Sequence, residues 1–172
     1  MTGLRSLRIG APESRIVART PSGPHPRTLQ LMFFANSSRE QLRRRYVDAW
    51  HRHREGLPLE PVDAQIADVI ALHPEYQALL ESSDALTRDF PVEAGQINPF
   101  LHMGLHLGLR EQVATDRPAG IATVHRRLAQ KLGSAHDAEH RMVDVLAETL
   151  WEAQRGGRAP DEQTYLERLR RL

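Results

Sequence analysis

Four histidines in this sequence form two pairs with helical spacing, His102 with His106 and His136 with His140. Residues four positions apart lie on one face of a helix, about 40° apart around its axis. Two imidazoles placed in this way can chelate a single metal ion. The first pair lies in the mostly apolar run NPFLHMGLHLGLREQ, so we expect both of its rings to point into the protein interior.

The second pair lies on the polar end of another apolar helix face. On a helix over residues 135–155, one arc holds the apolar residues Met142, Val143, Leu146, Ala147, Leu150 and Trp151. The same arc holds His136, Glu139 and His140, so these polar groups are also expected to point inward. We therefore predict a metal site made of the residues His102, His106, His136, His140 and Glu139. Glu139 is also a possible catalytic base, and the sequence indicates no other catalytic residue and no other cofactor-binding residue.

The sequence contains no cysteine, so a metal would be held by nitrogen and oxygen atoms alone. Histidine-rich sites of this kind favour zinc or iron first, and nickel or manganese after them. Both pairs are predicted within the first turns of their helices. The positive end of the helix dipole disfavours imidazolium there, which keeps the rings neutral and able to bind a metal.

Two other interpretations stay open for these histidines. In the first, the buried histidines bind no metal and form hydrogen bonds to carbonyl or carboxylate groups of the core. His73 extends an apolar helix face just before a proline, and we interpret it as a core histidine of this type. The run HDAEH matches the H-x-x-E-H pattern of inverted zinc proteases. Those enzymes need a third ligand far downstream, whereas only 32 residues follow His140.

The elements that position these residues are all predicted to be helices. Ser38 with Gln41 and Ser134 with Asp137 are capping boxes, and Asn98 before Pro99 caps a third helix. Apolar residues recur with helical periodicity throughout, and no alternating strand pattern is present. The predicted helices cover residues 38–56, 61–73, 74–82, 98–115, 120–132, 135–155 and 159–172. The sequence thus predicts an all-α, bundle-like single domain of six to seven helices over residues 32–172.

The two histidine pairs are expected to meet because short turns separate their helices. Two chain reversals would make the helices over 98–115 and 135–155 parallel, with their N-terminal ends at one level. At a rise of about 1.5 Å per residue, the two pairs would then differ in height by only about 3 Å. The four imidazoles would face a common point.

Charge is unevenly distributed along the chain. Residues 1–31 hold five of the 23 basic residues and one of the 22 acidic residues, which leaves 18 basic and 21 acidic residues in the rest. We interpret residues 1–31 as a disordered leader, or as an over-long gene start before Met32. The slightly acidic body argues against nucleic-acid binding, whose candidate residues would be Arg43, Arg44, Arg45, Arg126 and Arg127. No apolar run approaches the roughly 18 to 20 residues that span a bilayer, and we expect a cytoplasmic protein without membrane contact.

The segments NPFLHMGLH and REQVATDRPAGI are the most specific parts of a resemblance that covers residues 32–172. The chain resembles one family of uncharacterised proteobacterial proteins, the domain of unknown function 1841. This resemblance implies a small bacterial protein and no particular activity. The leading hypothesis is therefore a helical protein that binds a divalent metal, and the alternative is a metal-free protein–protein interaction module with core histidines. For either hypothesis, the expected partner is an unknown protein or small molecule.

Overall fold

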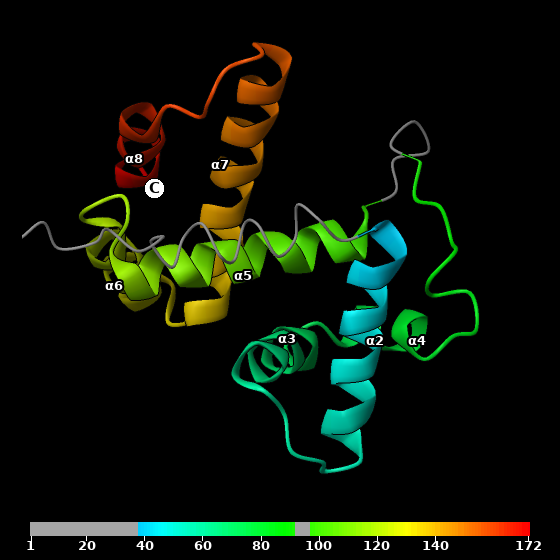
Figure 1. Cartoon of the computed structure of the whole chain (residues 1–172). Coiled ribbons are helices and arrows are strands. Elements are labelled where there is room, and N and C mark those ends of the chain that lie inside the picture. The colour runs from blue at the N-terminus through cyan, green and yellow to red at the C-terminus, as the bar shows by residue number, and fades with distance from the viewer. Residues whose placement is uncertain (1–37, 92–96) are drawn as a thin grey trace, which may run out of the picture. The chain divides into compact units, whose positions relative to one another are not determined.

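The computed structural model describes residues 38–91 and 97–172, and every regular element in these ranges is a helix. The prediction for residues 1–31 lies outside the described residues. In chain order (Figure 1), the helices are α2 (Arg39–Arg54), α3 (Pro61–Ala71), α4 (Pro74–Leu80), α5 (Pro99–Thr115), α6 (Ile121–Leu132), α7 (Ala135–Arg155) and α8 (Glu162–Arg170). The predicted all-α fold is confirmed. None of the described helices is long and apolar enough to cross a membrane.

The helix starts are fixed by local side-chain caps. Ser38 and Gln41 form the predicted capping box at α2. The Asn98 side chain accepts hydrogen bonds from the backbone of Phe100 and Leu101 at the start of α5, where Pro99 supplies a preset φ angle. At α7, the Ser134 hydroxyl accepts from the backbone N–H of Asp137. These caps determine where each histidine pair begins along its helix.

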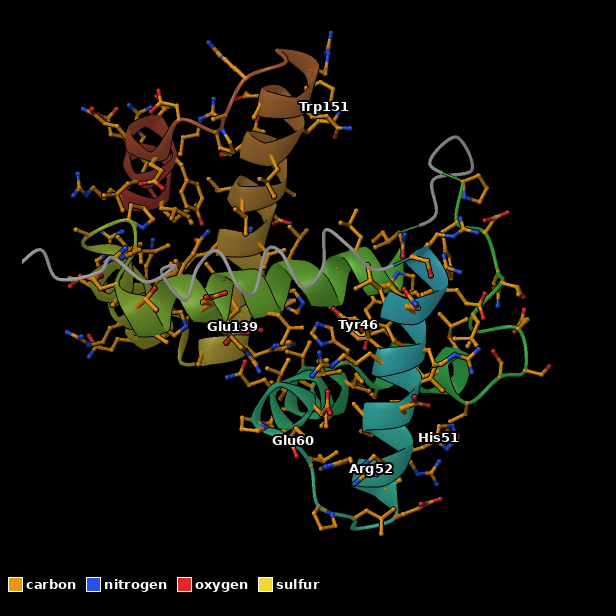
Figure 2. The ribbon with its side chains drawn as sticks, in the orientation of Figure 1. Tyr46, His51, Arg52, Glu60, Glu139 and Trp151 are labelled. Atoms are coloured by element: carbon orange, nitrogen blue, oxygen red, sulfur yellow. The ribbon has the colours of Figure 1, made fainter. Side chains whose placement is uncertain are left out.

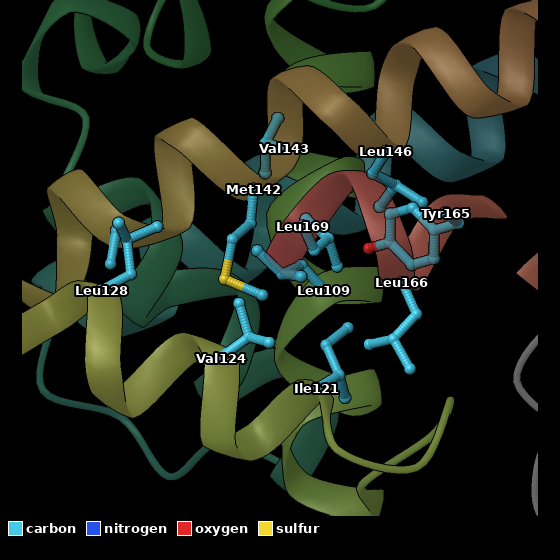
Figure 3. Packing of buried hydrophobic residues seen from close by; sticks show 11 residues of the cluster. Leu109, Ile121, Val124, Leu128, Met142, Val143, Leu146, Tyr165, Leu166 and Leu169 are labelled. Atoms are coloured by element: carbon cyan, nitrogen blue, oxygen red, sulfur yellow. The ribbon is translucent and has the colours of Figure 1, made fainter. Parts of the chain in front are cut away.

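Buried apolar residues form two clusters, and α5 contributes to both. The first cluster joins α2, α3, α4 and the first half of α5, with Ile66, Ile70, Leu80 and Met103 fully buried. The second cluster joins α6, α7, α8 and Leu109 of α5 (Figure 3). Helix α5 therefore connects two separately packed groups of helices. This dual role places the side chains of its first turns beside both groups.

The predicted parallel arrangement of α5 and α7 is wrong. Figure 1 shows the two helices crossing steeply, with the N-terminal turns of α7 beside the middle of α5. The reason is that α5 must pack along both clusters, whereas α7 contributes buried side chains to the second cluster alone. The histidine pairs nevertheless meet, because they lie near the crossing point.

The C-terminal part of α7 also differs from the predicted apolar arc. Leu150 is 41% exposed and Trp151 is 55% exposed, although both were expected to face the interior. Beyond Leu146 the buried positions of this helix are Thr149 and Ala153. Arg155 lies over the Trp151 ring with its guanidinium carbon 4.5 Å from the ring centroid, which covers part of the indole.

Candidate metal centre

Five histidines from three parts of the chain converge on one point. The loop between α3 and α4 supplies His73, α5 supplies His102 and His106, and α7 supplies His136 and His140. The closest ring centroids, those of His136 and His140, are 4.2 Å apart. All four histidines predicted from the sequence thus lie together, and His73 joins them.

The Nε2 atoms of His73, His102 and His140 form a nearly equilateral triangle. The His73–His102 distance is 3.2 Å, and His140 is 3.3 Å from each of the other two. A tetrahedral ion with Zn–N bonds of about 2.0 to 2.1 Å has ligand atoms about 3.3 to 3.4 Å apart. The triangle therefore matches one face of a tetrahedral zinc site.

Hydrogen bonding among these three atoms cannot replace a metal. A neutral Nε2 carries either one hydrogen or one lone pair, so at least one member of the triangle has no good partner within it. The tautomer of His73 is determined by its Nδ1 atom, which lies 2.7 Å from the Val69 carbonyl oxygen. A carbonyl only accepts, so Nδ1 of His73 carries the hydrogen and its Nε2 directs a lone pair at the triangle.

His106 is oriented by a buried carboxylate. Its Nδ1 lies 3.0 Å from Oε2 of Glu139, and Nε of Arg110 lies 3.0 Å from both Glu139 oxygens. Glu139 is labelled in Figure 2 on the first turns of α7. Because an ionised carboxylate only accepts, Nδ1 of His106 donates and its Nε2 holds a lone pair. That Nε2 is buried and has no hydrogen-bond partner among the residues that the structure describes.

The Glu139 carboxyl is held in its ionised form. Burial alone would raise its pKa, but hydrogen bonds from His106 and Arg110 outweigh this effect and lower the pKa below its ordinary value. This pattern of carboxylate, imidazole and free Nε2 is the usual outer-sphere arrangement of metal-binding histidines.

Burial lowers the pKa values of three of the converging imidazoles, those of His73, His102 and His140, and so favours their neutral form. Removal from water, followed by repulsion from neighbouring imidazoles, lowers the pKa of His102 to about 4. Burial also lowers the pKa values of His73 and His140. Neutral rings with free lone pairs are the state that binds metal ions.

Solvent access differs between the members of the cluster. His73 and His106 are fully buried, whereas His102, His136 and His140 are partly exposed. Tyr76 stacks on His73 at a centroid distance of 5.6 Å and meets the His102 ring edge-on at 5.7 Å. The centre is thus half enclosed, with the partly exposed rings on its accessible side.

Two groups of these residues have the proximity that a metal ion requires. In the first, one ring nitrogen each from His73, His102, His106 and His140 lies within 4.8 Å of the others. In the second, the same limit holds for one ligand atom each from His106, His136 and Glu139. Every residue of the predicted site belongs to one group or the other.

Sequence reasoning missed His73. The signal was its position three and four residues after the buried Ile70 and Val69, on the apolar face of α3. The proline after it suggested a helix end with a satisfied core histidine. Nothing local reveals that the loop between α3 and α4 lies against both α5 and α7.

Two of the five arginines named as nucleic-acid candidates, Arg43 and Arg45, make contacts within the fold. Arg43 is 3% exposed, donates to the carbonyl oxygens of Leu86 and Arg88, and lies over the Phe100 ring. Arg45 forms an ion pair with Asp63 across α2 and α3 at 2.6 Å. These contacts within the fold agree with the expectation that nucleic-acid binding is unlikely.

Fold and site together define an all-α protein with a histidine-rich candidate metal centre at a helix crossing. The chain belongs to the family described as Domain of unknown function (DUF1841), whose model matches residues 38–171. No curated protein and no solved structure matches the chain.

Proposed function

We propose that this protein binds one divalent metal ion through His73, His102, His106 and His140. The observation that carries the proposal is the triangle of three Nε2 atoms with sides of 3.2 to 3.3 Å. His106 is the fourth ligand because its Nε2 holds a buried lone pair without a partner. Four imidazole nitrogens at this spacing suit zinc or iron first, and nickel or manganese after them.

The ion would act first as a structural clamp. His73 follows α3 in the first apolar cluster, whereas His140 lies on α7 of the second cluster. A metal shared by these histidines would join the two groups of helices directly. Four protein ligands complete a tetrahedral sphere, which is typical of structural rather than catalytic zinc.

Glu139 is proposed as an orienting residue rather than as a ligand of this ion or a catalytic base. Its two oxygens face His106 and Arg110, and an ionised carboxylate with a lowered pKa is a weak base. The metal-free interaction module is less well supported, because it leaves the free nitrogen of His106 without an explanation. A bacterial, cytoplasmic setting remains a prediction from the sequence.

The test is elemental analysis of the full chain purified without an affinity tag, followed by chelation and reloading with zinc. We expect one tightly held ion per chain, lost in His102→Gln and retained in His51→Gln. His51 is an exposed histidine on α2 and serves as the matched control. A wild-type chain that neither retains nor rebinds a metal would refute the proposal and leave the interaction module.

A further inference from the structure

One histidine of the cluster is not used by the proposed ion. The ring of His136 lies 4.2 Å from that of His140 and stacks on that of His106 at 5.6 Å, measured between centroids. Its Nδ1 atom is buried and has no hydrogen-bond partner within residues 38–91 and 97–172. A buried polar atom without a partner costs about 1 to 3 kcal/mol, so a ligand for it is expected.

We propose that the centre takes a second divalent ion, held by His106, His136 and Glu139. One ligand atom from each of these residues lies within 4.8 Å of the other two. Two nitrogens and one carboxylate oxygen form a common ligand set for zinc. This proposal rests on the proposed function, because the second ion lies beside the first and shares His106 with it.

Sharing His106 places one ion on each nitrogen of its ring. Nε2 faces the first ion, and Nδ1, 3.0 Å from Oε2 of Glu139, faces the second. The hydrogen now between Nδ1 and Glu139 is therefore displaced by the second ion and released to solvent. Glu139 remains available, because a carboxylate offers about four lone-pair sites and its neighbours do not occupy all of them.

The second ion binds more weakly than the first for two physical reasons. It must displace a proton, and it approaches the Arg110 guanidinium, whose Nε lies 3.0 Å from both oxygens of Glu139. The positive charge of this guanidinium opposes the approach of a second cation to Glu139. Occupancy is therefore expected in two steps, with the triangle of Nε2 atoms filled first.

The experiment is equilibrium dialysis of the chelator-treated full chain against rising zinc concentrations, with metal and protein measured in the same samples. We expect two ions per chain at saturation for the wild type. His136→Gln is expected to bind one ion with the affinity of the first step, because His136 is not a ligand of the first ion. The double variant His51→Gln, His53→Gln removes exposed histidines of α2 and is expected to keep both ions.

The outcomes separate the two proposals. A wild-type chain that saturates at one ion refutes the second site and leaves the proposed function intact, whereas a chain that binds none refutes both. The second site is also refuted if His136→Gln keeps both ions or loses both together. Loss of the second ion in the α2 double variant would place it on the surface of that helix and overturn the assignment.

Discussion

The substitution His140→Leu is expected to have opposite consequences with and without metal. Within the described part of the chain, the hydrogen-bond contacts of His140 are the two Nε2 contacts of the triangle, at 3.3 Å to His73 and to His102. Without an ion, at least one nitrogen of the triangle is unsatisfied, at a cost of about 1 to 3 kcal/mol for a buried polar group. Because His140 is partly exposed, the lower end of this range applies. Removing its imidazole should therefore change the free energy of unfolding by less than about 1 kcal/mol, in the stabilising direction.

In zinc, the same substitution removes a ligand. At a free zinc concentration 100 times the dissociation constant, binding stabilises the wild type by about 2.7 kcal/mol. For a chain of this size, that corresponds to a rise in Tm of about 5 to 10 °C. His140→Leu is expected to show no comparable rise. Because the substitution is slightly stabilising without metal, its net cost in zinc is about 1.7 to 2.7 kcal/mol.

Urea unfolding measured in excess chelator and in excess zinc tests this reversal, with His51→Gln as the control that should change neither curve. The reasoning is refuted if His140→Leu destabilises the protein equally in both conditions. It is also refuted if zinc leaves the wild-type unfolding curve unchanged.

Three further predictions concern the same centre and its supporting fold. The metal-free protein should lose stability as pH falls from about 6.5 toward 4, because the pKa of His102 is about 6.5 in the unfolded chain and about 4 in the folded protein. Urea unfolding measured across this pH range should show a smaller loss in His102→Gln, because only the other histidines still contribute to it. Glu139→Gln should lower the affinity for the first zinc ion about 10- to 100-fold in a chelator competition assay, because the amide holds His106 less strongly than the carboxylate does. An unchanged affinity would exclude the orienting role. Arg43→Met should lower the free energy of unfolding by about 2 to 3 kcal/mol in urea, because two carbonyl oxygens lose a charged donor; a change below about 0.5 kcal/mol would contradict this role.

Local signals in the sequence determined the helices and the direction of most of their side chains. Ser38, Asn98 and Ser134 act through hydrogen bonds within a few residues, so their caps could be predicted without knowledge of the fold. The inward orientation of both histidine pairs followed from helical periodicity for the same reason. It failed at Leu150 and Trp151, because the neighbours of α7 change along its length.

Only the tertiary structure decided how these helices meet. The steep crossing of α5 and α7 depends on α5 packing into two clusters at once, which no single helix encodes. The inclusion of His73 depends on contacts with His102 and His140, which are 29 and 67 residues away along the chain. Likewise, the bonds of His106 and Arg110 to Glu139 join α5 to α7, and they determine which nitrogen of His106 is free. The sequence determined which residues could bind a metal, whereas long-range packing determined which of their lone pairs point at the same place.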